Sequence, residues 1–278
     1  MGLFKYLGVA GATGFLENQS VRFTQPKAYN DPFEMSPVFY SNKPISKGLN
    51  PKFGLTLEGY NPDLESFLVN DHSEYKYFLG HNLLDQINDI LGVTCFTFTQ
   101  GAIPVNLLMW AHYAESHRGI AVHFKDGVIG DNCLNKVHYV KKRPFLDANL
   151  LINSAELHVS DLFFKSDHWD YEQEYRLVRG LDVCNQLGVK DNIGHDIYIS
   201  NIDVETIERI FVGVNAPEEV KLLARQFYEK HGITVVFQQL AKRQFALVPE
   251  LILTKNKSDI DKFKAEYKSL EMTVFTRG

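Results

Sequence analysis

The chain has 278 residues, of which 45% are hydrophobic, and its formal net charge is −5. This composition is typical of a globular domain, and the weak negative balance argues against nucleic-acid binding through bulk charge, although a local basic patch stays open. No run of about 18 apolar residues occurs, so the sequence predicts no membrane-spanning helix.

The first half of the chain predicts two strands and two helices. Residues 20–26 and 93–100 are short β-rich runs that end in polar residues, which is typical of strands. Residues 61–92, between them, have the apolar spacing of a helix. A second, short helix is predicted over 104–119, with Gly119 in the left-handed position that often follows a last helical turn.

The second half of the chain predicts further strands with helices between them. Residues 119–124 and 135–140 are predicted to be neighbouring strands, 148–166 a helix and 168–180 a strand. The remaining predicted elements are strands over 207–214, 233–239 and 244–251 and a helix over 216–232.

The strands are spread along the chain without regular βαβ alternation, which indicates an α+β fold. We expect one domain over 1–251 and a charged helical tail over 252–278. The N-terminus lacks the basic and continuous apolar regions of a signal peptide, so a cytoplasmic location is expected. Three cysteines without CxxC spacing are expected to be reduced thiols rather than a disulfide framework or a zinc site. They are Cys95, Cys133 and Cys184.

The most unusual segment is "HWDYEQEYRLVRG", residues 168–180. Residues two apart share a face of a strand, so Glu172, Glu174 and Arg176 are expected on one face. Two adjacent carboxylates in a half-buried sheet raise at least one pKa unless cations compensate them, and Arg176 can compensate one. The alternative is a charged outer face with a cross-strand ion pair.

Two other segments carry candidate functional residues. Asn30–Pro32 is a turn signal, because Asn and Asp side chains cap the backbone and proline fixes the bend. Trp110, His112 and Tyr113 cluster where a helix meets a glycine turn, which is also typical of a hydrophobic core. The five-residue spacing of His112 and His117 differs from the i, i+4 pairs of helical zinc sites, so no metal site is predicted.

One compact basic patch lies in "HYVKKRP", residues 138–144, and its alternative interpretation is a solvated loop. The common nucleotide and hydrolase signatures are missing from the sequence: there is no Walker loop, GxGxxG, HExxH or GxSxG. Phosphate-loop, Rossmann and serine-hydrolase functions therefore lose their usual support.

Several separated motifs, in the same order, resemble a widespread bacterial family of unknown function. The chain begins with Leu3–Tyr6, reaches Asn-Asp-Pro-Phe-Glu over Asn30–Glu34, and has a Phe-Thr-Phe-Thr-Gln strand over Phe96–Gln100. Met-Trp-x-His-Tyr-Ala-x-x-His-x-Gly follows over Met109–Gly119, and Trp-x-x-Glu-x-Glu-x-Arg over Trp169–Arg176. The order of the motifs makes the resemblance specific over about residues 3 to 250.

This family pattern looks like the ADP-ribosyltransferase fold, in which a split mixed or antiparallel β-core with flanking helices holds NAD in a cleft. The resemblance implies that Glu172 and Glu174 match the Glu-x-Glu of the arginine-modifying branch. Breaking the nicotinamide–ribose bond passes through an oxocarbenium-like state, which a carboxylate stabilises. Glu174 is then the catalytic glutamate, Glu172 the acceptor-side base with a pKa near or above neutral, and Arg176 the charge that keeps both ionised.

The resemblance also implies residues that line the NAD site. They are Lys5, Tyr6, Arg22, Asn30, Asp31, Thr97, Thr99, His112, Tyr113 and Arg176. The chain departs from the transferase pattern in two strands: Lys5 stands in the strand where transferases place Arg or His, and Thr97 and Thr99 replace Ser-Thr-Ser. Lys5 or Arg22 is expected to reach the NAD phosphates.

Such domains resemble toxins and phage-defence effectors, which implies an inhibitory or antitoxin partner and a protein or nucleic-acid acceptor. Two alternatives remain. In a metal-dependent nuclease of a defence system, Asp31, Glu34, Glu172 and Glu174 would gather a divalent ion, assisted by Lys165 or Lys5. In a non-catalytic sensor module, the aromatic cluster would be the interaction surface.

Overall fold

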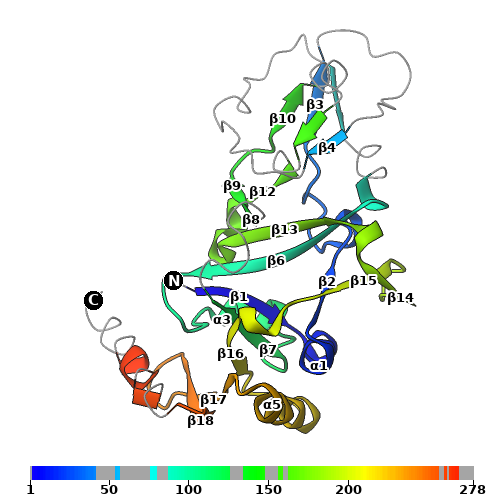
Figure 1. Ribbon diagram of the computed structural model, residues 1–278. Coiled ribbons are helices and arrows are strands. Elements are labelled where there is room, and N and C mark those ends of the chain that lie inside the picture. The colour runs from blue at the N-terminus through cyan, green and yellow to red at the C-terminus, as the bar shows by residue number, and fades with distance from the viewer. Residues whose placement is uncertain are drawn as a thin grey trace. The chain divides into compact units, whose positions relative to one another are not determined.

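In the computed structural model, most of the described regular elements are strands, many of them short (Figure 1). Several strands form one large mixed sheet, and a few helices accompany them. The structure describes residues 2–41, 54–56, 76–79, 87–125, 134–147, 156–158, 162–256, 260–261 and 263–268. The α+β class expected from the sequence is confirmed. The chain divides into two compact units: unit 1 is Met1–Val21, Phe96–Ile129 and Asn201–Gly278, and unit 2 is Arg22–Cys95 and Gly130–Ser200.

The sheet of unit 1 contains five strands and the end of a sixth, β6, which continues from unit 2. The strands are β1 (Gly2–Leu7), β6 (Leu91–Thr99), β7 (Ile120–Phe124), β16 (Ile207–Val212), β17 (Thr234–Leu240) and β18 (Leu247–Leu253). Their order is β18-β17-β16-β7-β1-β6. β16 and β17 are parallel, which requires a crossover connection, and a helix provides it; the other neighbours are antiparallel. The strands expected over 93–100, 119–124, 207–214, 233–239 and 244–251 are confirmed.

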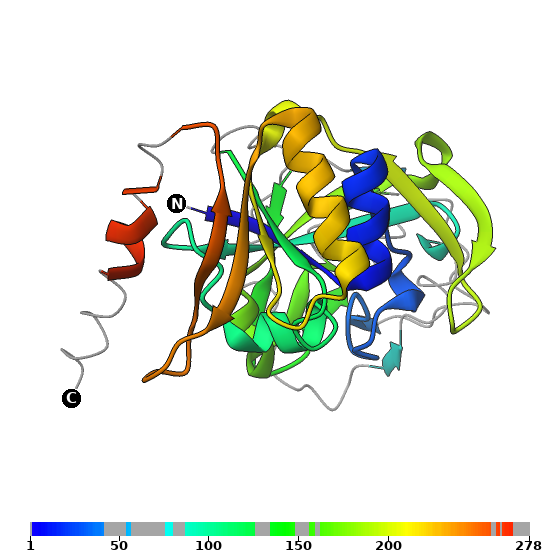
Figure 2. The ribbon, with the colours of Figure 1, turned by 90° about the horizontal axis from the view of Figure 1, so that it is seen from below.

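Two helices lie side by side over one face of this sheet, as Figure 2 shows. They are α1 (Val9–Asn18) and α5 (Glu218–His231). The rings of Phe15 and Phe227 stack between them with centroids 6.2 Å apart. Gly232 follows the last residue of α5 and is left-handed with φ 72°, and the helix predicted over 216–232 is confirmed.

The third helix, α3 (Leu107–Tyr113), is shorter than the 104–119 predicted. Asn106 begins it by accepting hydrogen bonds from the first-turn N–H groups, at 3.0 and 3.4 Å. The left-handed conformation predicted for Gly119 is wrong, because the positive φ angles fall on residues 115–117 instead. Gly119 is required for a different reason: a Cβ there would lie 1.8 Å from the carbonyl oxygen of Leu7.

Most described strands of unit 2 form small sheets, whereas β8 (Leu134–Lys136) and β13 (Glu174–Gly180) continue the sheet that contains β6. The other described strands are β2 (Ser20–Phe23), β3 (Val38–Ser41), β4 (Gly54–Thr56), β5 (Lys76–Leu79), β9 (His138–Val140), β10 (Phe145–Asp147), β11 (Glu156–His158), β12 (Phe164–Ser166), β14 (Asn185–Lys190) and β15 (Asp196–Asn201). Two of these cross the unit boundary: β2 begins in unit 1, and β15 ends there. β13 lies between β6 and β8, β3 lies between β10 and β5, and β9 and β12 form a parallel pair. The described residues form the 3-10 helices η1 (Pro26–Ala28), η3 (Asp167–Glu172), η4 (Leu181–Val183) and η5 (Val204–Thr206).

Several sequence predictions are wrong in unit 2. The helix expected over 148–166 is replaced by β11 and β12 where the structure describes it, and 148–155 lies outside the described residues. The helix expected over 61–92 contains β5 and the start of β6, and most of its remainder lies outside the described residues. β7 pairs with β1 and β16 whereas β8 pairs with β13, so these two strands are not neighbours. The strand expected over 20–26 is confirmed as β2.

The charged tail is helical at 260–261 and 263–268 and has a buried side. Phe263 is fully buried, with its ring centroid 5.9 Å from that of Phe211 in β16. The guanidinium of Arg209 lies 4.4 Å from the Phe263 ring centroid. The tail helix therefore packs on β16 through an aromatic contact. Of the helices in the described residues, none combines the length and the apolar character needed to span a membrane.

Candidate functional site

The segment that carries Glu172 and Glu174 changes structure between these two residues. Glu172 is the last residue of η3, Gln173 is left-handed with φ 45°, and Glu174 is the first residue of β13. The prediction that Glu172, Glu174 and Arg176 alternate along one strand is therefore wrong for Glu172. The left-handed residue breaks the alternation, and Glu172 approaches Glu174 from the end of a helical turn.

Lys165, in β12, brings the two glutamates together. Its Nζ lies 2.6 Å from Glu172 Oε2 and 3.2 Å from Glu174 Oε2. The same Nζ lies 3.7 Å from Oε2 of Glu34, in the Asn-Asp-Pro-Phe-Glu turn. These side chains are at most 5% exposed. One ammonium therefore serves three buried carboxylates, which come from separate parts of unit 2.

Arg176 provides the second cation. Its Nε donates to Glu174 Oε1 at 2.8 Å, and its Nη2 donates to Glu174 Oε2 at 3.1 Å and to Glu34 Oε1. The guanidinium lies 5.3 Å from the ring centroid of Tyr29 and 5.2 Å from that of Phe163. Arg176 is fully buried, so the aromatic rings and carboxylates replace its water shell.

Glu34, Lys165, Glu172, Glu174 and Arg176 together form what we call the charge cluster. Three carboxylates against two cations leave one formal negative charge, which is costly in a buried site. Burial raises the pKa of Glu174, and Glu172 raises it further, against the opposing effects of Lys165 and a hydrogen bond from Cys95. The environment of Glu174 thus favours its protonated form.

Three side chains beside the charge cluster were not predicted from the sequence. The Cys95 thiol hydrogen-bonds Glu174, and its Sγ lies 3.4 Å from the hydroxyl of Tyr29. The hydroxyl of Tyr139 accepts a hydrogen bond from the backbone N–H of Glu174 at 2.9 Å. Burial raises the pKa of both tyrosines. A thiol and two phenols therefore surround Glu174, and no local sequence signal marks them because each comes from a different strand or loop.

The geometry tests the nuclease alternative. Within the described part of the chain, no group of three or more His, Cys, Asp or Glu residues is arranged to hold a metal ion. The three carboxylates of the charge cluster face Lys165 and Arg176 instead. Asp31, the fourth proposed ligand, accepts a hydrogen bond from Phe33 N at 2.9 Å and acts as a turn cap.

The other predicted residues of unit 2 lie in different environments. Arg22 pairs with Asp191, Nη2 to Oδ2 at 2.6 Å. Partial burial opposes ionisation of Asp191, but the hydrogen bonds from Arg22 and from the backbone N–H groups of His195 and Ile193 outweigh it and lower its pKa to about 2. Arg22 is thus bound in an ion pair with Asp191. Asn30 is exposed.

Six predicted NAD-lining residues belong to unit 1: Lys5, Tyr6, Thr97, Thr99, His112 and Tyr113. Lys5 and Tyr6 are buried in β1: the ammonium of Lys5 lies 5.5 Å from the ring centroid of Phe96, and the Tyr6 ring meets Trp110 edge-on at 5.4 Å. Thr99 donates to the carbonyl oxygen of Gly101 at 2.5 Å.

Thr97 is buried, and His112 and Tyr113 form a T-shaped ring pair with centroids 6.3 Å apart. The unit 1 residues thus contact one another and the core. Their role in NAD binding stays a prediction.

A family model described as "Protein of unknown function (DUF2971)" matches residues 109–177, which include the greater part of α3 and the Trp-x-x-Glu-x-Glu-x-Arg motif. No curated protein and no solved structure matches the chain. The chain is therefore similar over this segment to a family of unknown function.

Proposed function

We propose that the charge cluster is the catalytic site of an ADP-ribosyltransferase that uses NAD as substrate. The observation that carries the proposal is the pair of glutamates, Glu172 and Glu174, held 2.6 and 3.2 Å from a single ammonium group. Two carboxylates in one site with different environments are a recurrent basis for dividing catalytic roles. The Glu-x-Glu motif and the order of the other motifs support the same chemistry, and this support is by analogy.

The proposed chemistry gives each glutamate a role. Nicotinamide leaves the ribose C1′ with the bonding electron pair, and positive charge develops on the ribose. Glu174 as carboxylate stabilises that charge. The acceptor nucleophile then attacks C1′ and passes its proton to Glu172. Lys165 and Arg176 hold both groups in place before the substrate arrives.

The same assignment fixes the sign of the pH dependence. Glu174 acts as a carboxylate, and burial raises its pKa. Activity is therefore expected to rise with pH as Glu174 loses its proton. The acceptor is proposed to be a protein or nucleic acid, and the biological role that of a toxin or phage-defence effector held by an inhibitory partner.

The test is nicotinamide release from NAD by the purified protein, with cell lysate supplied as acceptor source. Glu174→Gln is compared with Glu229→Gln, a control at an exposed position on α5. Loss of release in Glu174→Gln alone, with both variants folded by circular dichroism, supports the proposal. No release by wild type with lysate and RNA present, together with magnesium-dependent cleavage of nucleic acid, contradicts it.

A further inference from the structure

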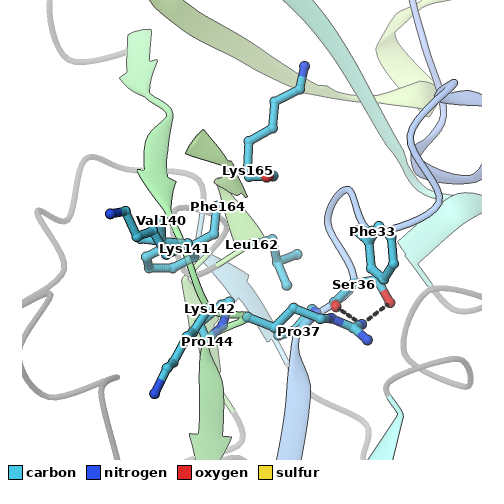
Figure 3. Close-up of a pocket in the computed structure, with 12 residues that line it drawn as sticks. Phe33, Ser36, Pro37, Val140, Lys141, Lys142, Pro144, Leu162, Phe164 and Lys165 are labelled. Atoms are coloured by element: carbon cyan, nitrogen blue, oxygen red, sulfur yellow. Dashed lines mark hydrogen bonds between the residues drawn. The ribbon is translucent and has the colours of Figure 1, made fainter. Parts of the chain in front are cut away.

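A pocket of about 200 Å³ in unit 2 has the chemistry of an anion site with apolar walls (Figure 3). It is lined by the basic turn between β9 and β10 together with Val140, by Phe33, Ser36 and Pro37, and by Leu162, Phe164, Lys165 and Ser166. Lys141, Lys142 and Arg143 follow one another in that turn. Among the described lining residues none is acidic, so the three cations are not neutralised within the pocket.

Arg143 provides a second, independent observation. Its Nη2 donates to the carbonyl oxygen and the hydroxyl of Ser36, as the dashed lines in Figure 3 mark. Its Nε is also buried but has no hydrogen-bond acceptor among the described residues. Buried donors are normally satisfied, so this N–H indicates a missing acceptor such as a phosphate or carboxylate oxygen.

Aromatic walls narrow the choice of ligand. Phe33 is 59% exposed, and the Arg143 guanidinium lies 5.4 Å from its ring centroid. Phe164 lines the pocket as well. Phe164 is buried, so Phe33 provides the exposed ring. An exposed aromatic ring beside consecutive cations is a combination with which proteins stack a base and bind its phosphate. The carboxylate side chains of an acidic peptide would present no aromatic face to this ring.

Lys165 separates this pocket from the charge cluster. The residue lines the pocket, but in Figure 3 its side chain points away from the other lining residues, and its Nζ binds Glu172 and Glu174. The charge available to a ligand therefore comes from the turn at Lys141–Arg143. The pocket is smaller than the typical ligand site of about 300 Å³ or more, so it suits one nucleotide unit at most.

We propose that this pocket binds a nucleotide unit, with its phosphate on the Lys141–Arg143 turn and its base on Phe33. The unit comes from a free mononucleotide or from one residue of a single-stranded RNA. The inference goes beyond ADP-ribosyl transfer, because binding here needs neither Glu174 nor NAD turnover.

The experiment measures fluorescence anisotropy of a labelled single-stranded RNA, and AMP binding by calorimetry, with no NAD present. Lys141→Gln/Lys142→Gln and Phe33→Leu are compared with wild type. The matched control is Lys242→Gln/Arg243→Gln, which removes two adjacent exposed cations from the β17–β18 turn. The lysine double variant is expected to weaken RNA binding and to reduce the salt slope of log Kd by about 1 for each phosphate-binding lysine lost.

The outcomes separate the two sources. AMP binding that the Lys141→Gln/Lys142→Gln variant weakens identifies a free mononucleotide as sufficient. RNA binding without AMP binding, weakened in the same variant and in Phe33→Leu, identifies a residue of a strand. The proposal is overturned if neither probe binds saturably, or if the Lys242→Gln/Arg243→Gln control weakens binding equally, because bulk charge would then explain the effect.

Discussion

Replacing Lys165 with glutamine is the most direct perturbation of the charge cluster. Its Nζ is the shared partner of Glu172, Glu174 and Glu34, at 2.6, 3.2 and 3.7 Å. With Lys165 present, three carboxylates face two cations. With glutamine in its place, the same three carboxylates face Arg176 alone, and the formal charge of the buried cluster changes from −1 to −2.

The magnitude follows from burial. Removing one partner of a buried ion pair costs about 3–5 kcal/mol, because the other charge remains buried without compensation. Two charge-assisted hydrogen bonds at about 1.5–3 kcal/mol each give about 3–6 kcal/mol, which overlaps this range. We therefore expect Lys165→Gln to lower the free energy of unfolding by about 4 kcal/mol near neutral pH. The side chain is 3% exposed, so solvent screening does not reduce this figure much.

The assay is urea unfolding followed by circular dichroism, with Lys190→Gln as control. Lys190 pairs with Asp196 at 3.2 Å, but the two side chains are 62% and 36% exposed, so its loss is expected to cost less than about 1 kcal/mol. The deficit of Lys165→Gln should shrink as pH falls, because protonated carboxyls no longer need the cation. A deficit no larger than that of Lys190→Gln, or one independent of pH, would refute the reasoning.

Three further changes test other parts of the structure. The pKa of Glu174 is raised in the folded state, so its contribution to stability is present below the unfolded pKa and is lost as pH rises through the folded pKa. Glu174→Gln should therefore remove this part of the pH dependence of the unfolding free energy, measured by urea titration. Gly119→Ala should destabilise the fold by about 1–3 kcal/mol or more, because the new Cβ overpacks against Leu7. Gly101→Ala is its control and should cost far less in thermal melts, because a Cβ at Gly101 meets nothing within 4 Å. Asn106→Ala should cost about 0.5–2 kcal/mol by removing the cap of α3, and Asn106→Asp should retain most of it.

Local patterns predicted several unit 1 elements, such as α5 and the strands, but they did not predict helix α1 (Val9–Asn18). The apolar spacing of 216–232 and the glycine that follows the last turn locate α5 within two residues at each end. The helix expected over 148–166 fails for a non-local reason. β12 exists because it pairs in parallel with β9, and this non-local pairing overrides the helical spacing of "DLFFKS".

The sequence predicts that Glu172 and Glu174 lie close together, but the reason it gives, alternation along one strand, is wrong. Strand alternation placed Glu172 beside Glu174, but the left-handed Gln173 breaks the alternation. What brings the two carboxylates together is Lys165, which the local pattern places at the end of a predicted helix and which only the nuclease alternative uses. Residue types within one motif show that charges are present, but the identity of their partners depends on tertiary contacts.

The Asn-Asp-Pro-Phe-Glu turn gains a physical role from the same contacts. The Asp31 side chain accepts a hydrogen bond from Phe33 N at 2.9 Å, and the Asp31 carbonyl accepts one from Glu34 N at 3.1 Å. These two bonds close the turn and hold the backbone of Glu34 in position. Glu34 then reaches Arg176, which is 142 residues later in the chain. Because Arg176 also binds Glu174, two motifs that are remote in sequence are parts of one buried charge balance. A change at Glu34 should therefore shift the titration of Glu174, and that coupling links the turn to the proposed catalytic carboxylate.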